Sequence, residues 1–520
     1  NVYMTFEIVF VLLSLLGMMA ALIADKMRPG MGLFSVVGLF LCLGILTPKE
    51  MLEGFSNKGM ITVALLFLVS EGIRQSGTLG QVIKKLLPQG KTTVFKAQLR
   101  ILPSVAFISA FLNNTPVVVI FAPIIKHWAK SVKLPATKFL IPLSYVTILG
   151  GICTLIGTST NLVVHGMILE AGYEGFTMFE LGKVGIFIAI AGIIYLFIFS
   201  KRLLPDARPD TAVPDEEVEE GEKLHRVEAV LGARFPGINK KLSDFNFQRH
   251  YGAEVKEIKT RNGQRYVDHL EDVVLREGDT LVVMADDTFI PTWGESSVFV
   301  LLTNGNDPDT SGKKKRWLAL ILLVLMIVGA TVGELPATKE MFPDIKLDMF
   351  FFVCITTIIM AWTNIFPARK YTKYISWDIL ITIACAFAIS KAMVNSGVAD
   401  CVAGFIIGLS DDYGPHVLLA ILFVITNLFT ELITNNAAAA LAFPLALSIS
   451  AQLGVSPTPF FVVICMAASA SFSTPIGYQT NLIVQGIGNY KFTDFVRIGL
   501  PLNIITFLIS VILIPLIWNF

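Results

Sequence analysis

The sequence is poor in charge and in cysteine, and it lacks the motifs of several common protein classes. Charged residues make up only 16% of the chain, whereas 54% of its residues are hydrophobic. This composition excludes an ordinary soluble enzyme and predicts a polytopic membrane protein whose surroundings are the lipid bilayer. The six cysteines have no metal-ligand spacing, so we expect them to pack as small hydrophobic residues. A net charge of +1 says little about partners, and we expect no nucleic acid among them.

Motifs for catalysis and for cofactors are also missing. The sequence contains no Ser–His–acid or Cys–His pattern and no cluster of metal ligands, so we predict neither an enzymatic activity nor an organic cofactor. It has no TVGYG-type filter, which argues against a potassium channel. His127 and His165 stand alone near expected loops or caps and are assigned no role.

Long apolar segments occur in two series of the same order. The first series, residues 1–204, is predicted to contain three spans, an interfacial helix, a re-entrant hairpin, a broken span and a final span, at 5–24, 31–48, 57–75, 78–91, 95–127, 139–169 and 183–203. The second series, residues 316–520, is predicted to contain three spans, a hairpin, a broken span and a final span, at 317–333, 347–366, 376–394, 414–449, 457–489 and 495–518.

The two series are copies of one unit. A constant shift superimposes polar and glycine residues of one series on those of the other: by 320 residues, Gly77 on Gly397, Gly157 on Gly477 and Asn161 on Asn481; by 321 residues, Ser109 on Thr430 and Asn114 on Asn435. Each copy makes an odd number of full crossings, so the copies must insert in opposite orientations. The sequence therefore predicts an inverted repeat.

The distribution of basic residues predicts the sidedness. Most Lys and Arg residues outside the central region fall on the same side of the membrane as that region; the exceptions are Lys49, Lys58, Lys183, Lys339, Lys346 and Lys391. The positive-inside rule then places the central region in the cytoplasm and both termini outside, in a multi-pass protein of the plasma membrane.

The central region has the composition of a soluble domain. An acidic linker at 205–224, which contains the run Asp215 to Glu220, precedes a domain at 225–300, and a basic linker at 301–315 follows it. Short strand patterns at 227–233, 253–260 and 280–286 surround one amphipathic helical pattern at 239–252. We predict a small α+β domain, and because it lacks a GxGxxG motif it has no Rossmann-type nucleotide site.

Polar residues interrupt the apolar sequence at each hairpin tip. Burying such amides without partners costs about 2 to 7 kcal/mol apiece, so something must offset the cost. Asn114 and Thr115, followed by Pro116, suit the start of a helix, and Asn435 and Asn436 precede an alanine run that favours one. A helix N-terminus offers free N–H groups and a partial positive charge. Each tip is therefore a candidate anion site.

The broken spans supply two further helix starts. Gly157 permits a break, and the residues that follow it, Thr158, Ser159, Thr160 and Asn161, can cap a new half-helix. The second copy offers the corresponding residues Gly477, Tyr478, Thr480 and Asn481. Four half-helix starts are then expected to converge at the membrane midplane. They could bind an anion without any Lys or Arg.

A doubly charged anion held only by neutral dipoles is costly to desolvate, which favours a compensating cation. Carbonyls at the hairpin tips, at Gly157 and at Gly477, together with the oxygens of Ser109, Thr430 and Thr434, are the hard ligands that sodium prefers. The sequence thus predicts two symmetry-related cation sites that flank one substrate. Intramembrane Asn and Thr often only hold helices together, but four symmetric occurrences favour a binding site.

One acidic residue stands beside the second tip only. Glu431 has no acidic counterpart in the first copy, where Ala110 takes its place. It is either a proton- or ion-binding group or a residue that makes a structural hydrogen bond.

These motifs resemble a known transporter family. The stretches IPLSYVTILGGICTLIGTSTNLVVHG, ELITNNAAAALAFP and TPIGYQTNLIVQG are similar to the divalent anion:sodium symporter (DASS) family, and in particular to its sulfate-transporting branch. The family's paired Ser-Asn-Thr pattern stands here as Asn113-Asn114-Thr115 and Thr434-Asn435-Asn436, with the central asparagine kept in each copy. Residues 225–289 look like a TrkA-C (RCK-C) domain, notably in NFQRHYGAEVKEIKTRNGQ.

The resemblance implies a homodimeric, elevator-type symporter that carries sodium together with a divalent anion. By motif matching, it implies one sodium site at Ser109, Asn113, Asn114 and Gly157, and another at Thr430, Thr434, Asn435 and Gly477. It implies substrate contacts at Asn114, Thr115, Thr158, Asn435, Asn436 and Tyr478. Because asparagine replaces smaller residues in the pattern, we expect a compact anion, sulfate, rather than a dicarboxylate. A dicarboxylate or other anion carrier and a regulated channel are the alternatives.

Overall fold

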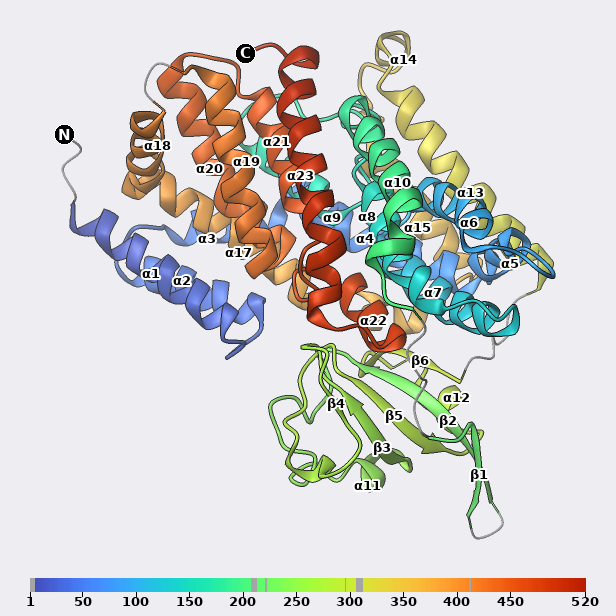
Figure 1. The fold of residues 1–520 in the computed structure, drawn as a ribbon. Coiled ribbons are helices and arrows are strands. Elements are labelled where there is room, and N and C mark those ends of the chain that lie inside the picture. The colour runs from blue at the N-terminus through green and yellow to red at the C-terminus, as the bar shows by residue number, and fades with distance from the viewer. Residues whose placement is uncertain (1–4, 207–212, 220–221, 295, 305–311, 411–412) are drawn as a thin grey trace.

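The structure, a computed structural model, describes residues 5–206, 213–219, 222–294, 296–304, 312–410 and 413–520. Its helices form one broad body, and a small β-sheet domain is attached to one side of that body (Figure 1). Across the described residues, eight helical stretches are long and apolar enough to cross a membrane. The predicted fold class, an all-helical polytopic membrane protein with a small α+β domain, is confirmed.

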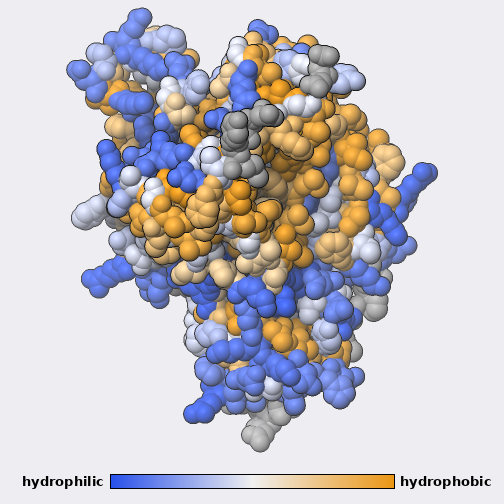
Figure 2. Space-filling model, turned by 90° about the vertical axis from the view of Figure 1, so that its left-hand side faces the viewer, coloured by the Kyte–Doolittle hydropathy of each residue, from blue (hydrophilic) through white to orange (hydrophobic). Residues whose placement is uncertain are grey.

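Surface hydropathy follows the same division. Figure 2 shows hydrophobic residues over much of the helical body, whereas hydrophilic residues predominate on the sheet domain below it. The C-terminus and α14 (Pro336–Met341) lie at the end of the helical body away from the sheet (Figure 1). An apolar layer therefore separates these segments from the sheet domain.

The first repeat supplies the helices that run from the N-terminus to the sheet domain. They are α1 (Phe6–Ile23), α2 (Pro29–Cys42), α3 (Pro48–Glu53), α4 (Lys58–Gln75), α5 (Thr78–Leu86), α6 (Val94–Ser109), α7 (Asn114–Ser131), α8 (Leu140–Gly151), α9 (Ser159–Glu170) and α10 (Gly182–Leu203). The hairpin is the pair α6 and α7, and the broken span is the pair α8 and α9.

The second repeat follows the sheet domain. Besides α14, its helices are α13 (Lys313–Gly333), α15 (Met349–Trp362), α16 (Tyr371–Tyr374), α17 (Trp377–Ser396), α18 (Val398–Leu409), α19 (Pro415–Leu432), α20 (Asn435–Leu453), α21 (Thr458–Ser469), α22 (Gln479–Gly488) and α23 (Phe492–Ile517). The hairpin is the pair α19 and α20, and the broken span is the pair α21 and α22.

Two of the expected spans and the interfacial helix at 78–91, which ends at Leu86 as α5, are shorter than predicted. Four helices of the membrane body were not predicted: α3, α14, α16 and α18. The segments expected as spans at 31–48 and 347–366 end early, as α2 and α15, because Gly44 and Asn364 adopt left-handed backbone (φ +74° and +54°) that stops each helix. These two residues are related by the 320-residue shift. Helix α18 is the unpredicted counterpart of α5, and each follows a glycine with positive φ, Gly77 or Gly397.

The sheet domain consists of antiparallel strands around an aromatic core. The strands are β1 (Glu216–Glu219), β2 (Glu222–Leu231), β3 (Glu254–Lys259), β4 (Arg265–Tyr266), β5 (Thr280–Ala285) and β6 (Phe299–Thr303), in the order β1-β2-β5-β3-β4 with β6 also paired to β2. Phe235, Phe247 and Phe299 are buried and in ring contact with one another. Short helices α11 (Phe247–Tyr251) and α12 (Phe289–Trp293) complete the domain.

Two expectations for this region were wrong in part. The helix expected at 239–252 is confined to α11, because Asn246 caps it at that point and the preceding backbone pairs instead with the chain at Val273 and Leu275. Part of the acidic segment is not a linker but strand β1, and β6 extends into the segment assigned to the basic linker. The remaining linker residues lie partly outside the described residues.

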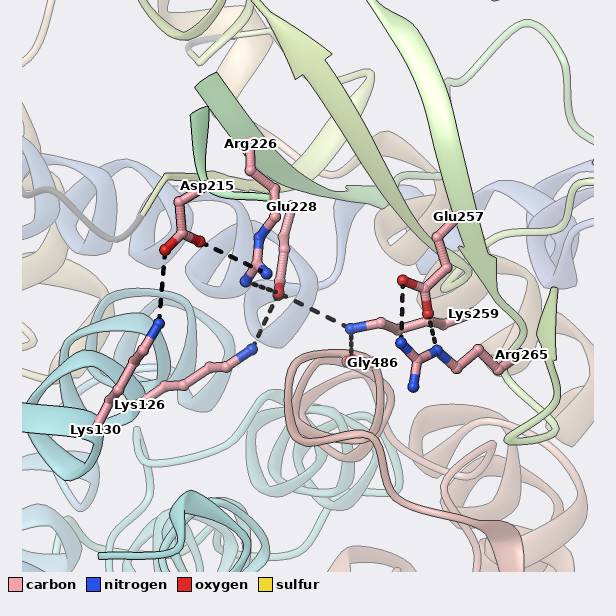
Figure 3. A network of polar contacts seen from close by, with 9 residues as sticks. All are labelled: Lys126, Lys130, Asp215, Arg226, Glu228, Glu257, Lys259, Arg265 and Gly486. Carbon is pink, nitrogen blue, oxygen red and sulfur yellow. Dashed lines mark hydrogen bonds and ion pairs between the residues drawn. The ribbon is translucent and has the colours of Figure 1, made fainter. Parts of the chain in front are cut away.

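A buried charge cluster joins the sheet domain to the helical body (Figure 3). The Glu228 carboxylate on β2 lies 3.0 Å from Lys126 Nζ of α7 and 3.9 Å from Lys259 Nζ of β3. Lys259 also donates to the carbonyl of Gly486 in α22, at 3.3 Å. One carboxylate thus links the domain to α7 and, through Lys259, to α22. These are two of the helices that begin at the polar breaks.

Candidate functional site

Four helices begin inside the helical body at the polar breaks: α7, α9, α20 and α22. Only α20 has a side-chain cap, because Thr434 Oγ1 accepts from the N–H of Ala437 at 3.3 Å. The capping residues of the other three helices, Asn113, Thr158 and Tyr478, make no such bond. These three helix starts therefore keep first-turn N–H groups without a side-chain acceptor, next to the positive end of the helix dipole.

The start of α7 meets the broken span of the other repeat. Asn114 Nδ2 donates to the Tyr478 hydroxyl at 2.8 Å, and Thr115 Oγ1 donates to Gln479 Oε1 at 3.5 Å. Asn114 is only 2% exposed, so the tip of the first hairpin is enclosed by protein.

The start of α20 makes the reciprocal contact. Asn436 Oδ1 accepts from Thr160 Oγ1 at 3.2 Å and from Ser159 Oγ at 3.4 Å. Under the repeat shift, the contact between Asn436 and Ser159 corresponds to that between Thr115 and Gln479. Each hairpin tip therefore lies against the broken span of the opposite repeat. The Tyr478 hydroxyl, which bonds Asn114, also interacts with Thr158 at the start of α9, and this contact links the two pairs of helix starts.

Oxygen atoms converge behind the first hairpin tip. Ser109 Oγ lies 2.8 Å from Asn114 Oδ1 and 2.8 Å from the carbonyl of Thr147. A single hydroxyl proton can serve only one of these two acceptors. We call these three oxygens, from Ser109, Asn114 and Thr147, the first oxygen cage.

The second hairpin repeats this arrangement. Thr430 Oγ1 lies 2.6 Å from Asn435 Oδ1 and 2.5 Å from the carbonyl of Ala468. We call the oxygens of Thr430, Asn435 and Ala468 the second oxygen cage; each is related to its equivalent in the first by 321 residues. Each cage has three oxygens, from a hydroxyl, an amide and a carbonyl, but only one hydroxyl proton to share among them. Such a set of oxygens is suited to a hard monovalent cation such as sodium.

The orientation of the Asn114 amide bears on the first cage. As placed, its oxygen faces only other oxygens, including the carbonyl of Gly157. Turning the amide over would let its nitrogen donate to Gly157 at 3.2 Å and to Ser109 at 2.8 Å. A bound cation would stabilise the present orientation instead, because it would attract every one of these oxygens.

The two glycines of the broken spans allow close approach. A Cβ at Gly157 would lie 2.3 Å from the carbonyl of Gly151, and one at Gly477 would lie 2.6 Å from Ser471 Oγ and 2.9 Å from the carbonyl of Thr430. Only glycine leaves these loops space to fold against the cages.

The predicted caps of the broken helices were right only in part, because Thr158 and Tyr478 occupy the capping positions whereas the other candidates, Thr160, Asn161, Thr480 and Asn481, do not. Asn161 and Asn481 lie in the first turn of α9 and α22, and their amides donate back into the preceding loops. Asn161 donates to the carbonyls of Gly151 and Thr154, and Asn481 to those of Ser471 and Thr474. Thr160 bonds Asn436, and Thr480 accepts from Ser144 Oγ at 2.9 Å. These residues hold the loops in shape, and the capping positions belong to Thr158 and Tyr478.

Asn113, which was predicted as a sodium ligand, is not among the oxygens of the first cage. Asn113 lines a cavity of about 20 Å³, together with Ser159 and apolar residues of α4 and α13. That volume suits a single water molecule and is too small for an oxyanion. The helix starts themselves are closed on one another by the direct bonds between Asn114 and Tyr478 and between Thr160 and Asn436.

Sequence reasoning missed three contributors. The carbonyls of Thr147 and Ala468 complete the cages, but a backbone oxygen has no signal in the sequence. Gln479 reaches Thr115, and its position directly after Tyr478 could have indicated it.

Comparisons with known proteins agree with this architecture. The family model described as "Citrate transporter" matches residues 18–453 and 344–520. The chain is 30% identical to an uncharacterized transporter of Synechocystis over 93% of both chains. It is 28% identical to a putative sulfur deprivation response regulator of Chlamydomonas reinhardtii, over 92% of this chain and 96% of that protein. It is 22% identical to a probable sodium/sulfate cotransporter of the same alga, over 88% and 82% respectively.

Proposed function

This chain belongs to the citrate transporter family and is a multi-pass secondary anion transporter, and from that premise we propose that it carries sulfate into the cell together with sodium. The relative named as a probable sodium/sulfate cotransporter supports both the ion and the substrate. The family description names citrate, so a carboxylate carrier of the same fold is the second candidate.

The observation that carries the proposal is the pair of oxygen cages beside the meeting point of the four helix starts. The first cage shares Asn114 with the contact to Tyr478, and the second shares Asn435 with the start of α20. A cation in a cage would thus lie next to the place where N–H groups and amides face an anion. Cation and anion would stabilise one another, which is the physical basis of coupling.

The residues proposed to bind sulfate are Asn114, Thr115, Thr158, Asn435, Asn436 and Tyr478. To admit the anion, the direct bonds from Asn114 to Tyr478 and from Thr160 to Asn436 have to open. The anion then takes the place of the lost partners, accepting from the amides, the hydroxyls and the free first-turn N–H groups. The sodium ions would be held by the two cages, with the Gly157 and Gly477 loops beside them.

The wider arrangement is also proposed. The sheet domain is a cytoplasmic, TrkA-C-like regulatory or dimer-stabilising domain, and both termini lie outside the plasma membrane. Opposite sides for the C-terminus and the sheet domain are supported by their positions at opposite ends of the helical body (Figure 1) and by the hydrophobic surface of that body (Figure 2). The chain works as a homodimer, and transport follows an elevator mechanism in which the hairpins and broken spans move together.

Uptake of labelled sulfate into vesicles that contain the purified protein tests the proposal. We expect uptake that saturates and that an inward sodium gradient accelerates several-fold over a potassium gradient. Unlabelled thiosulfate should compete, because it is also a compact tetrahedral dianion. Succinate and citrate should compete weakly, because the asparagine side chains at the hairpin tips leave less room for an extended carboxylate than the smaller residues of the family pattern would.

Two results would contradict this assignment. Competition by succinate or citrate as strong as that by sulfate would favour the carboxylate carrier. Flux that ignores the sodium gradient and does not saturate would favour a regulated channel. Thermal unfolding gives an independent measurement, since an anion that stabilises the protein only in sodium is a coupled substrate.

A further inference from the structure

A single acidic side chain, Glu431, lies in the last turn of α19 next to the second oxygen cage. A carboxylate is unfavourable both within an apolar layer and at the negative end of a helix dipole. Among the described residues, Glu431 takes part in no ion pair with Lys, Arg or His. Its presence therefore needs a physical account.

The surroundings of Glu431 consist of donors. Oε1 accepts from the N–H of Ser473 at 3.1 Å and from Asn503 Nδ2 at 2.9 Å. Oε2 accepts from the N–H of Thr474 at 3.1 Å and from its hydroxyl at 2.8 Å. An ionised carboxylate only accepts hydrogen bonds, so these four donors suit the ionised form of Glu431. All of these donors are neutral, so the negative charge stays uncompensated.

The carboxylate and the second cage share one loop. Thr474 Oγ1, which bonds Glu431, also accepts from the N–H of Gly477 at 3.3 Å. The carbonyl of Thr430, the residue before Glu431, accepts from Ser471 Oγ in the same loop at 3.2 Å. The charge is therefore held close to the oxygens of Thr430, Asn435 and Ala468.

The first repeat shows that the loop does not need this acid. There Thr154, the equivalent of Thr474, donates its hydroxyl to the backbone carbonyl of Ala110. In the second repeat the Thr474 hydroxyl lies 3.2 Å from the carbonyl of Glu431 and 2.8 Å from its carboxylate, so these two acceptors compete for its single proton. Since the first loop keeps its contact between Thr154 and the Ala110 carbonyl without an acid, the carboxylate is not needed for this contact, and what it adds is charge.

We propose that Glu431 makes the two cages unequal, so that the second cage binds sodium more tightly and fills before the anion arrives. The inference rests on the sodium coupling proposed above. At an effective dielectric constant near 20, a unit charge within about 10 Å changes cation affinity by about tenfold or more. The first cage, beside Ala110, lacks this contribution and depends on the anion for its charge balance.

The test measures sodium-dependent thermal stabilisation of the purified protein without any anion substrate. Glu431→Gln removes the charge and keeps the shape. Asn503→Ala removes one donor and keeps the charge. Glu334→Gln is the control, since Glu334 is also a carboxylate that accepts a backbone N–H, from Met178, far along the chain from the cages.

We expect Glu431→Gln to need about tenfold more sodium for half of the stabilisation. Asn503→Ala should unfold at a lower temperature but respond to sodium as the wild type does, and Glu334→Gln should respond normally. Glu431→Asp, which retains the charge on a shorter side chain, should keep most of the sodium response even if Glu431→Gln cannot be purified.

Three outcomes would overturn the inference. A normal sodium response in Glu431→Gln would show that the charge does not act on the cage. A purely structural role for Glu431 would follow if Glu431→Gln and Asn503→Ala lost the sodium response equally, or if Glu431→Asp lost the sodium response. A wild-type protein indifferent to sodium would overturn the proposed coupling as well, which distinguishes that failure from the other two.

Discussion

Replacing Asn114 or Asn435 by alanine is expected to abolish sodium-dependent sulfate uptake. Each amide takes part in an oxygen cage, Asn114 with Ser109 and Asn435 with Thr430. Asn114 also bonds Tyr478 where the helix starts meet. Alanine removes the amide and leaves the buried partners unpaired, at about 1–3 kcal/mol for each group. Loss of several such contacts corresponds to a fall in uptake of about a hundredfold or more.

The measurement is the initial rate of labelled sulfate uptake in vesicles that contain equal amounts of folded protein. Asn395→Ala is the matched control, because Asn395 also donates its amide to a side chain and to a carbonyl, those of Glu50 and Ile45, outside the cages. It should transport at close to the wild-type rate. Normal uptake by both Asn114→Ala and Asn435→Ala would refute the proposed site.

Replacing Glu228 by glutamine is expected to loosen the sheet domain. Burial raises the pKa of this carboxyl group, but the charges of Lys126, Lys259 and Arg226 outweigh that effect and lower the pKa from 4.5 to about 2. Such a shift corresponds to about 3 kcal/mol of stabilisation from the ionised group. Glutamine loses this stabilisation and leaves the cations without their shared partner.

Hydrogen–deuterium exchange of β2 and β3 measures the effect. Loss of about 3 kcal/mol of stabilisation free energy should accelerate exchange roughly a hundredfold at those amides that exchange through local opening. Lys241→Met is the control, because the pair of Lys241 with Asp272 is solvent-exposed and such pairs contribute about 0–1 kcal/mol. Unchanged exchange in Glu228→Gln would mean that the cluster does not hold the domain.

The same group predicts a pH dependence. Because the pKa of Glu228 is lower in the folded protein than its ordinary value of 4.5, its stabilisation is fully present above that value. It is lost as the pH falls from about 4.5 towards 2 and the carboxylate takes up a proton. Exchange of β2 should accelerate over this window in the wild type. In Glu228→Gln the part of the pH dependence that comes from this group should disappear.

Much of the helical architecture could be predicted from residue types at fixed spacing. Asn114 and Asn435 stand in apolar sequence. A continuous helix would bury their amides without partners, which is costly, and the sequence therefore predicted a break at each of them. The constant shift between the two series showed that the breaks are related. The early ends of α2 and α15 were missed because Gly44 and Asn364 stop a helix only through their left-handed backbone.

The sequence by itself therefore determined the repeat, the polar breaks and the residue types that could hold ions, because these follow from hydrophobic pattern and local backbone preference. Only the tertiary structure decided which oxygens converge, since the carbonyls of Thr147 and Ala468 carry no side-chain identity. It also decided that Asn161 turns back to hold a loop rather than cap a helix. It brought Glu228 against Lys126 as well. Such contacts join residues far apart in the chain, and their geometry depends on how whole helices pack.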